Sequence, residues 1–119
     1  MRMWMIDPKL LCDKHLLGEH GEIHKHLHNF VKQHSISGRI VPVVQIEPNS
    51  MQYRHDELAK EMLERGFNHN SPYKQPDLNY LPYHERYAKV NLVVSIIDLS
   101  NRCQDCKSRI ESAEIILLT

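Results

Sequence analysis

The feature that most constrains the fold is a row of apolar residues between Pro8 and Gln33. They stand at intervals of seven, four and three positions, at Leu16, Ile23, Leu27 and Phe30. A helix completes a turn about every 3.6 residues, so this spacing places the four side chains on one face. The sequence therefore predicts an amphipathic helix from about residue 8 to about residue 33 that is buried along that face.

A second helix is predicted between Ser50 and Gly66. Asn49 or Ser50 can cap its first turn, because both side chains accept hydrogen bonds from backbone N–H groups that lack a partner. Leu58 and Met62 lie four positions apart and are expected to face the core. Gly66 suits the left-handed backbone conformation that commonly follows a helix, so it is the expected end.

The other segments are less regular. A third helix is expected from about residue 85 to about residue 101, with an apolar stripe of Tyr87, Val90, Val94 and Ile97. The β-branched residues of this segment also suit a strand. Pro42 lies in the middle of segment 38–48, which we expect to be an extended connection. Residues 68–84 hold three prolines and should form a long ordered connector, and the apolar tail 113–119 should dock on the core.

The length of 119 residues suits one compact domain, 1–119, with one modest core. We expect an all-α fold of about three helices with long connectors. No run approaches the roughly 18 apolar residues of a membrane span, and the chain start lacks the order of a signal peptide. A soluble cytoplasmic protein, in the host cytoplasm if viral, is therefore expected. Fifteen basic residues balance fifteen acidic ones, so any nucleic-acid binding must come from a local basic patch.

Residues 13–28 hold five histidines and two glutamates. On a helix, one line is formed by His15, Glu19, Glu22 and His26 at the edge of the apolar stripe, and another by His20, His24 and His28. Histidines four positions apart can chelate zinc or iron, but they also occur on ordinary solvated helix faces. Cys103 and Cys106 form a CxxC pair, which we expect to be free thiols or a zinc clip with two histidines, for which His84 is a candidate. The main expectation is a protein without a cofactor or metal.

The chain start can supply a nucleophile. An α-amino group has a pKa near 7.7 to 8.0, so a useful fraction is unprotonated at neutral pH. Such an amine forms a Schiff base at a sugar C1′, and a nearby carboxylate can stabilise the cation and move protons. A large second residue, Arg2, normally leaves the initiator Met1 in place. Trp4 and Ile6 are expected to anchor this segment in the core and fold it back over the first helix.

Four stretches occur in an order that resembles the phage pyrimidine-dimer DNA glycosylase family, often called endonuclease V of the T-even phages: LLCDKHLLGEHGEIHKH, VKQHSISGR, RHDELAKEMLERGFN and YLPYHE. The resemblance covers roughly residues 1–90. It implies an all-α domain that binds a kinked double-stranded DNA as a monomer and flips a base out of the stack. It also implies that the N-terminal α-amine displaces the damaged base and that β-elimination then nicks the strand.

By position, the resemblance implies that Met1 supplies the amine and Glu22 the catalytic carboxylate. The expected DNA contacts are basic side chains in the same region: Arg2, Lys14, His15, Lys25, His26 and Arg54.

The chain departs from the family at Gly21, where an arginine is typical, in a shortened loop after Pro48, and in its tail. Its balanced charge predicts weaker and less salt-sensitive DNA binding. If the histidines compensate for the missing arginine at Gly21, DNA binding should strengthen as the pH falls towards 6. The alternative is a non-catalytic DNA- or protein-binding module on the same fold, clipped by zinc through Cys103 and Cys106. The sequence leaves open which lesion or modified pyrimidine is removed.

Overall fold

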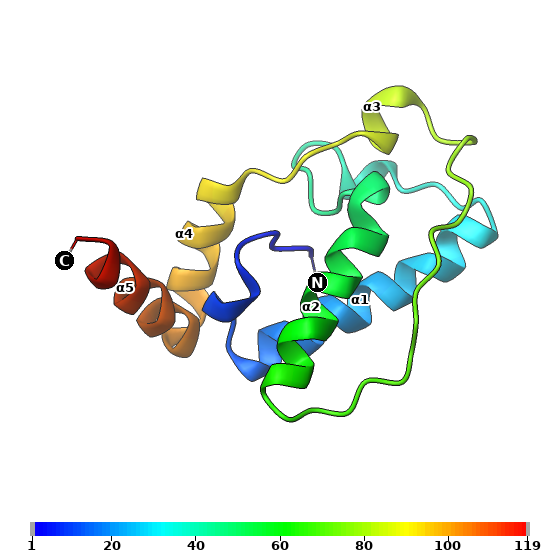
Figure 1. Cartoon of the computed structure of the whole chain (residues 1–119). Coiled ribbons are helices and arrows are strands. Elements are labelled where there is room, and N and C mark those ends of the chain that lie inside the picture. Colours follow the sequence, from blue (N-terminus) through cyan, green and yellow to red (C-terminus); the bar gives the residue numbers. More distant parts are fainter. Residues whose placement is uncertain (1, 119) are drawn as a thin grey trace.

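A computed structural model describes residues 2–118 of the chain, with side chains described for residues 2–113. All regular structure in this part is helical, which confirms the all-α prediction (Figure 1). The α-helices are α1 (Asp13–Val31), α2 (Met51–Glu64), α3 (Tyr83–Arg86), α4 (Leu92–Arg102) and α5 (Gln104–Leu118), and the short 3-10 helices are η1 (Pro8–Leu10), η2 (Ser37–Arg39) and η3 (Pro48–Ser50). None of these helices is long and apolar enough to cross a membrane.

The first predicted helix is interrupted near its start. Pro8 begins η1, and the Asp7 carboxylate accepts a hydrogen bond from the Lys9 backbone N–H at 3.0 Å. Leu11 and Cys12 then adopt extended backbone conformations and turn their side chains into the core. The long helix α1 consequently begins at Asp13, five residues later than the proline suggested.

The apolar stripe of α1 is confirmed, because Leu16, Ile23 and Phe30 are buried and Leu27 is half-buried. Helix α2 lies against α1 and buries Leu58 and Met62, as predicted. Two backbone hydrogen bonds end α2, from Phe67 N–H to the Met62 carbonyl at 2.9 Å and from Gly66 N–H to the Leu63 carbonyl at 3.0 Å. Gly66 has φ +88°, so it ends the helix as expected.

The predicted third helix is replaced by two helices. The Asn91 side chain accepts a hydrogen bond from Val94 N–H at 3.1 Å and starts α4 there, separating it from the single turn of α3. Helix α4 buries Ser95 and Leu99. Of the predicted stripe, only the residue that precedes α4 is buried, whereas the other three are exposed: Tyr87, Val94 and Ile97. The predicted apolar stripe ran through the loop that precedes α4, so it marked the wrong face of the actual helix.

The connectors agree better with the sequence. The segments 40–47 and 67–82 contain no helix or strand, and Tyr73, Leu78 and Leu81 hold the second connector on the core. Helix α5, which the sequence did not predict, packs against α4 and η1. The predicted docking of the apolar tail on the core concerns residues 114–119, whose side chains lie outside the described part of the structure.

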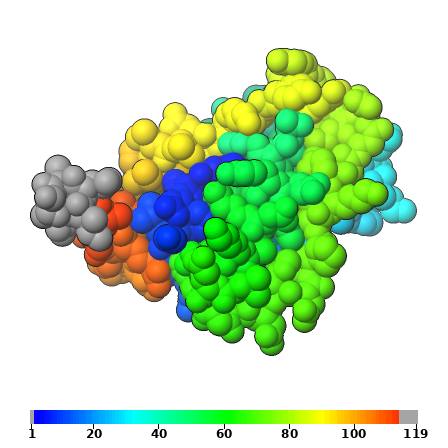
Figure 2. Space-filling model, in the orientation of Figure 1, coloured from blue at the N-terminus to red at the C-terminus, as the bar shows by residue number. Residues whose placement is uncertain are grey.

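The N-terminal segment lies at the centre of the molecule. Met3, Trp4 and Ile6 are buried, which confirms the predicted anchoring of Trp4 and Ile6. The Met3 backbone N–H donates to the Gln45 carbonyl at 2.8 Å. Figure 2 shows this segment in blue between the green α2 and the orange α5. The first residues of the chain are therefore held by elements from both halves of the sequence.

A buried ion pair joins α1, α2 and the N-terminal segment. Arg54 and Glu19 are both fully buried, and the guanidinium donates to the two Glu19 carboxylate oxygens at 2.6 and 2.9 Å. Arg54 also donates to the Ile6 carbonyl and to Glu57, each at 2.7 Å. No part of Arg54 faces solvent, which corrects its expected role as a DNA contact.

We predict that Arg54→Leu destabilises the protein by about 3–5 kcal/mol, because it leaves the buried Glu19 carboxylate without a partner. Urea unfolding measured by circular dichroism checks this value. Lys60→Leu is the matched control, since Lys60 is exposed on the same helix and its loss should change stability by less than about 0.5 kcal/mol. An Arg54→Leu protein as stable as the control would contradict the structural role.

Candidate active site and metal-ligating clusters

Glu22 lies on α1 as a buried carboxylate, 6% exposed. Its Oε1 is 3.1 Å from His26 Nε2, and His26 Nδ1 is 3.3 Å from the Asn29 side-chain nitrogen. Since Asn29 nitrogen can only donate, His26 Nδ1 accepts and the proton of the neutral ring lies on Nε2. His26 therefore donates to Glu22 and fixes its orientation, and its expected contact with DNA stays a prediction.

Burial lowers the pKa of His26, and the attraction of Glu22 offsets this effect only in part. The positive charges of Arg39 and Lys25 lower the pKa of His26 further. A neutral imidazole beside a carboxylate is consequently favoured at neutral pH. In this arrangement Glu22 keeps one hydrogen bond from a fixed donor and remains available to accept a proton.

The segment 39–45 is hydrogen-bonded to the N-terminal segment. Arg39 donates to the Gln45 side-chain oxygen at 3.2 Å, and the Gln45 backbone N–H donates to the Arg39 carbonyl at 2.7 Å. The Gln45 carbonyl accepts from the Met3 backbone N–H. The charge of Arg39 also acts on His26, the partner of Glu22. Met1 itself lies outside the described residues.

Arg2 is the first described residue and lies beside an open groove of about 490 Å³. Its guanidinium donates to Asp98 at 3.2 Å and to Ser95 at 3.4 Å, and lies over the Trp4 ring. The groove is lined by side chains from three segments: Arg2, Val43, Gln45, Val94, Asp98 and Arg102. With two arginines and one aspartate, it is a place where a phosphate can bind if it displaces Asp98 from Arg2.

The remaining DNA-contact candidates are divided. Lys14 and Lys25 are exposed on α1, where a duplex can reach them. His15 is half-buried, and its ring meets the Trp4 ring edge-on at 5.9 Å. Its Nδ1 lies near the sulfurs of Cys12 and Cys106, which belong to the cysteine cluster described next.

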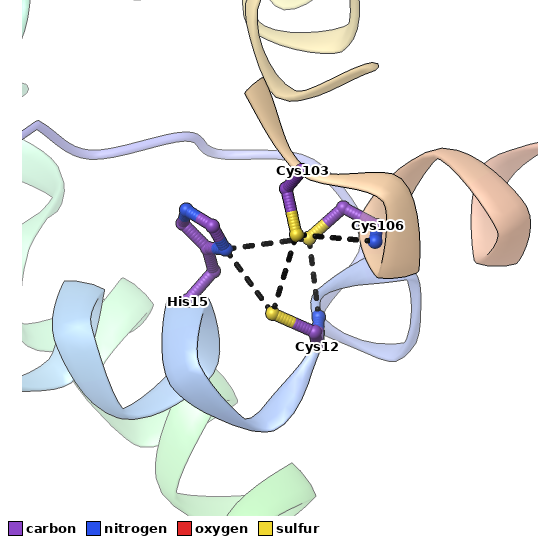
Figure 3. A group of neighbouring side chains, drawn as sticks. All are labelled: Cys12, His15, Cys103 and Cys106. Carbon is purple, nitrogen blue, oxygen red and sulfur yellow. Dashed lines mark hydrogen bonds between the residues drawn. The ribbon is translucent and has the colours of Figure 1, made fainter. Parts of the chain in front are cut away.

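The first metal-ligating cluster consists of Cys12, His15, Cys103 and Cys106 (Figure 3). Cys12 and His15 come from the start of α1, whereas the two other residues come from the junction of α4 and α5. The three cysteines are free thiols. Burial raises the pKa of Cys106 to about 12. Burial also opposes ionisation of Cys103, but hydrogen bonds from Cys106 and Cys12 lower its pKa overall.

The second cluster brings four histidines together: His20, His24, His55 and His69. The Nε2 atom of His69 lies 3.0 Å from that of His20 and 3.3 Å from that of His55, and the Nε2 atoms of His24 and His55 are 3.1 Å apart. Burial, and then the charges of the three other rings, lower the pKa of His20 to about 4. His20 is therefore favoured as a neutral ring beside the other three.

Sequence reasoning missed most of both clusters. It expected Cys103 and Cys106 to be free thiols or a zinc clip with two histidines such as His84, but His84 is exposed and lies beside Glu85. A detectable signal was present, because Cys12 and His15 repeat the CxxC spacing at a helix start. For the histidine cluster, only the pair at positions 20 and 24 was visible as a helical spacing.

The comparisons with known proteins support the fold-level resemblance. A family model described as pyrimidine dimer DNA glycosylase matches residues 1–75, a shorter stretch than the 90 or so residues expected. No curated protein and no solved structure matched the chain. The matched stretch includes Glu22, His26 and the N-terminal segment. The chain therefore belongs to the pyrimidine dimer DNA glycosylase family.

Proposed function

We propose that the protein is a DNA glycosylase with AP-lyase activity that removes a damaged or modified pyrimidine from double-stranded DNA. The observation that carries this proposal is the buried carboxylate of Glu22, oriented by His26 within the stretch that matches the family. The α-amine of Met1 would be the nucleophile. The anchoring of Met3 and Trp4 restricts where that amine can lie, which favours a defined reaction geometry.

The reaction begins with attack of the neutral amine on the sugar C1′, which breaks the bond to the base. The base leaves with the electron pair and takes a proton from solvent. The proton lost by the amine passes to Glu22 and then to the ring oxygen, as the sugar opens to an iminium ion. Removal of a C2′ proton then breaks the C3′–O bond, and the 3′ phosphate leaves. Water hydrolyses the imine and restores the amine.

In this mechanism Glu22 stabilises the cationic intermediate and moves protons. His26 is a positioning residue, because its Nε2–H fixes the Glu22 carboxylate without reaching the sugar itself. The exposed Lys14 and Lys25 and the groove beside Arg2 provide local positive charge for DNA phosphates. A damaged pair is easier to open, so the cost of flipping favours lesions over normal bases.

We expect Glu22→Gln to reduce turnover of a duplex that carries a cyclobutane pyrimidine dimer by at least about 100-fold, the lower range for loss of acid–base catalysis. The amide can still accept from His26, so the melting temperature should change little. Strand nicking on a denaturing gel measures the activity. Glu64→Gln, at an exposed position of α2, is the matched control and should keep wild-type turnover. Equal activity of the two variants would remove Glu22 from the mechanism.

We also predict that borohydride reduction traps a covalent adduct between the protein and duplex DNA with an abasic site. The adduct should map to the N-terminal peptide by mass spectrometry. Adding the dipeptide Gly-Ser before Met1 should abolish it, because the amine is then displaced, whereas the same dipeptide after Thr119 should not. An adduct on a lysine would refute the role of the amine.

The alternative, a non-catalytic DNA- or protein-binding module, makes a different prediction in the same assay. Such a module can bind the duplex, but it gives neither an adduct nor nicked DNA. The cysteine and histidine cluster at the α4–α5 junction is compatible with either function, since a structural metal does not compete with the amine.

A further inference from the structure

We propose that Cys12, His15, Cys103 and Cys106 bind a structural zinc ion that fastens the α4–α5 hairpin to the start of α1. The glycosylase mechanism proposed above uses none of these four side chains. Two of its ligands lie beyond residue 75, where the family match ends. Figure 3 shows the four side chains converging on one point from two separate parts of the chain.

The distances fit a tetrahedral zinc centre. Zn–S bonds of about 2.3 Å and Zn–N bonds of about 2.0–2.1 Å place two sulfurs about 3.8 Å apart and a sulfur about 3.5 Å from a nitrogen. Cys12 Sγ lies 3.7 Å from Cys103 Sγ, and Cys106 Sγ lies 3.6 Å from His15 Nδ1. The Cys12 Sγ to His15 Nδ1 distance is shorter, at 3.1 Å. All four ligand atoms lie within 4.8 Å of one another.

The surroundings suit metal-bound thiolates. The Cys12 backbone N–H points at Cys106 Sγ at 3.3 Å, and the Cys106 backbone N–H points at Cys103 Sγ at 3.4 Å. Such donors stabilise negative charge on sulfur. Binding of Zn²⁺ by three thiolates and one neutral imidazole releases three thiol protons and leaves one net negative charge. The Arg102 guanidinium lies over Trp4, next to His15, and partly balances that charge.

The donor set also selects the ion and its role. Thiolates combined with imidazole in a tetrahedral arrangement are typical of zinc. Four protein ligands leave no open position for water or substrate, so the site is structural. The hairpin that it fastens carries Asp98 and Ser95, the two partners of Arg2. Zinc would therefore help to hold the wall of the groove beside the chain start.

The test measures metal in tag-free protein of the full chain. Metal analysis by mass spectrometry should find zinc in the wild type, and Cys12→Ser and Cys103→Ser should each lose one equivalent relative to it. Gln104→Ser, at an exposed position beside Cys103, is the matched control and should retain all of it. A Cys103→Ser protein that keeps as much zinc as the control would overturn the proposal.

Cobalt substitution keeps the proposal testable if the cysteine variants do not fold. The wild-type protein loaded with Co²⁺ should show a thiolate-to-cobalt charge-transfer band and the strong visible bands of tetrahedral cobalt. Its three thiols should resist a thiol reagent until a chelator is added. Thiols that react at the same rate with and without metal would refute the site. Both readouts are independent of DNA cleavage, so they distinguish failure of this proposal from failure of the glycosylase function.

A separate observation supports a second ion. Four neutral imidazoles around a tetrahedral divalent ion place their nitrogens about 3.3–3.4 Å apart, from Zn–N bonds of about 2.0–2.1 Å. The Nε2 contacts in the histidine cluster are 3.0, 3.1 and 3.3 Å. His55 Nδ1 lies 2.9 Å from the Asp56 carboxylate, the arrangement that commonly orients a metal-bound histidine. We infer that His20, His24, His55 and His69 bind a divalent ion such as zinc and join α1, α2 and the following connector.

Zinc titration of the metal-free protein should then reach two equivalents. The double variant His24→Asn/His69→Asn should lose one of them and keep the full thiolate-to-cobalt band of the cysteine site. His28→Asn, at an exposed position of the same helix, is the control and should bind two. In a matching Co²⁺ titration, saturation of the wild-type protein at one equivalent with the complete charge-transfer band would refute the histidine site.

Discussion

The buried pairing of Arg54 with Glu19 is the interaction on which the rest of the structure depends. Taking two charges out of water is costly, and it is tolerated only when the remaining hydrogen-bonding capacity is used. Here the guanidinium donates to Glu19, Glu57 and the Ile6 carbonyl, so one side chain fixes two helices and the N-terminal segment together. Because Ile6 is tied to the same guanidinium as Glu19, the N-terminal segment is fixed relative to α1.

Helix α1 contributes to the core, to the buried ion pair and to the candidate active site, because its side chains point in different directions around the axis. Leu16, Ile23 and Phe30 form its apolar face, and Glu19 lies at the ion pair. Glu22 is three residues further along, at an angle of about 300° around the axis. It therefore remains close enough to the core to be buried, yet contacts His26 instead of Arg54. One helix thus separates a carboxylate used for stability from one available for chemistry.

The sequence predicted what is local and missed what depends on distant contacts. The stripe of α1 and the left-handed end of α2 at Gly66 were predictable, since spacing and glycine conformation determine them. The phase of α4 was not, because Asn91 restarts the helix and the apolar pattern runs through the break. Glu22 was found through family resemblance. The role of Arg54 and the meeting of Cys12 with Cys103 needed three-dimensional contacts between segments far apart in sequence.

The small size of the chain explains why cross-links between distant segments would matter. A chain of 119 residues buries a limited core, and α4 leaves Val93 and Ile97 exposed. The α4–α5 hairpin buries Leu99, Cys106 and Ile110 in the core. Polar contacts at Arg2, Cys12 and His15 attach it as well. Arg2 follows the proposed nucleophile Met1 directly in the sequence. The contacts of Arg2 with Asp98 and Ser95 therefore attach the C-terminal hairpin to the segment that carries the proposed nucleophile.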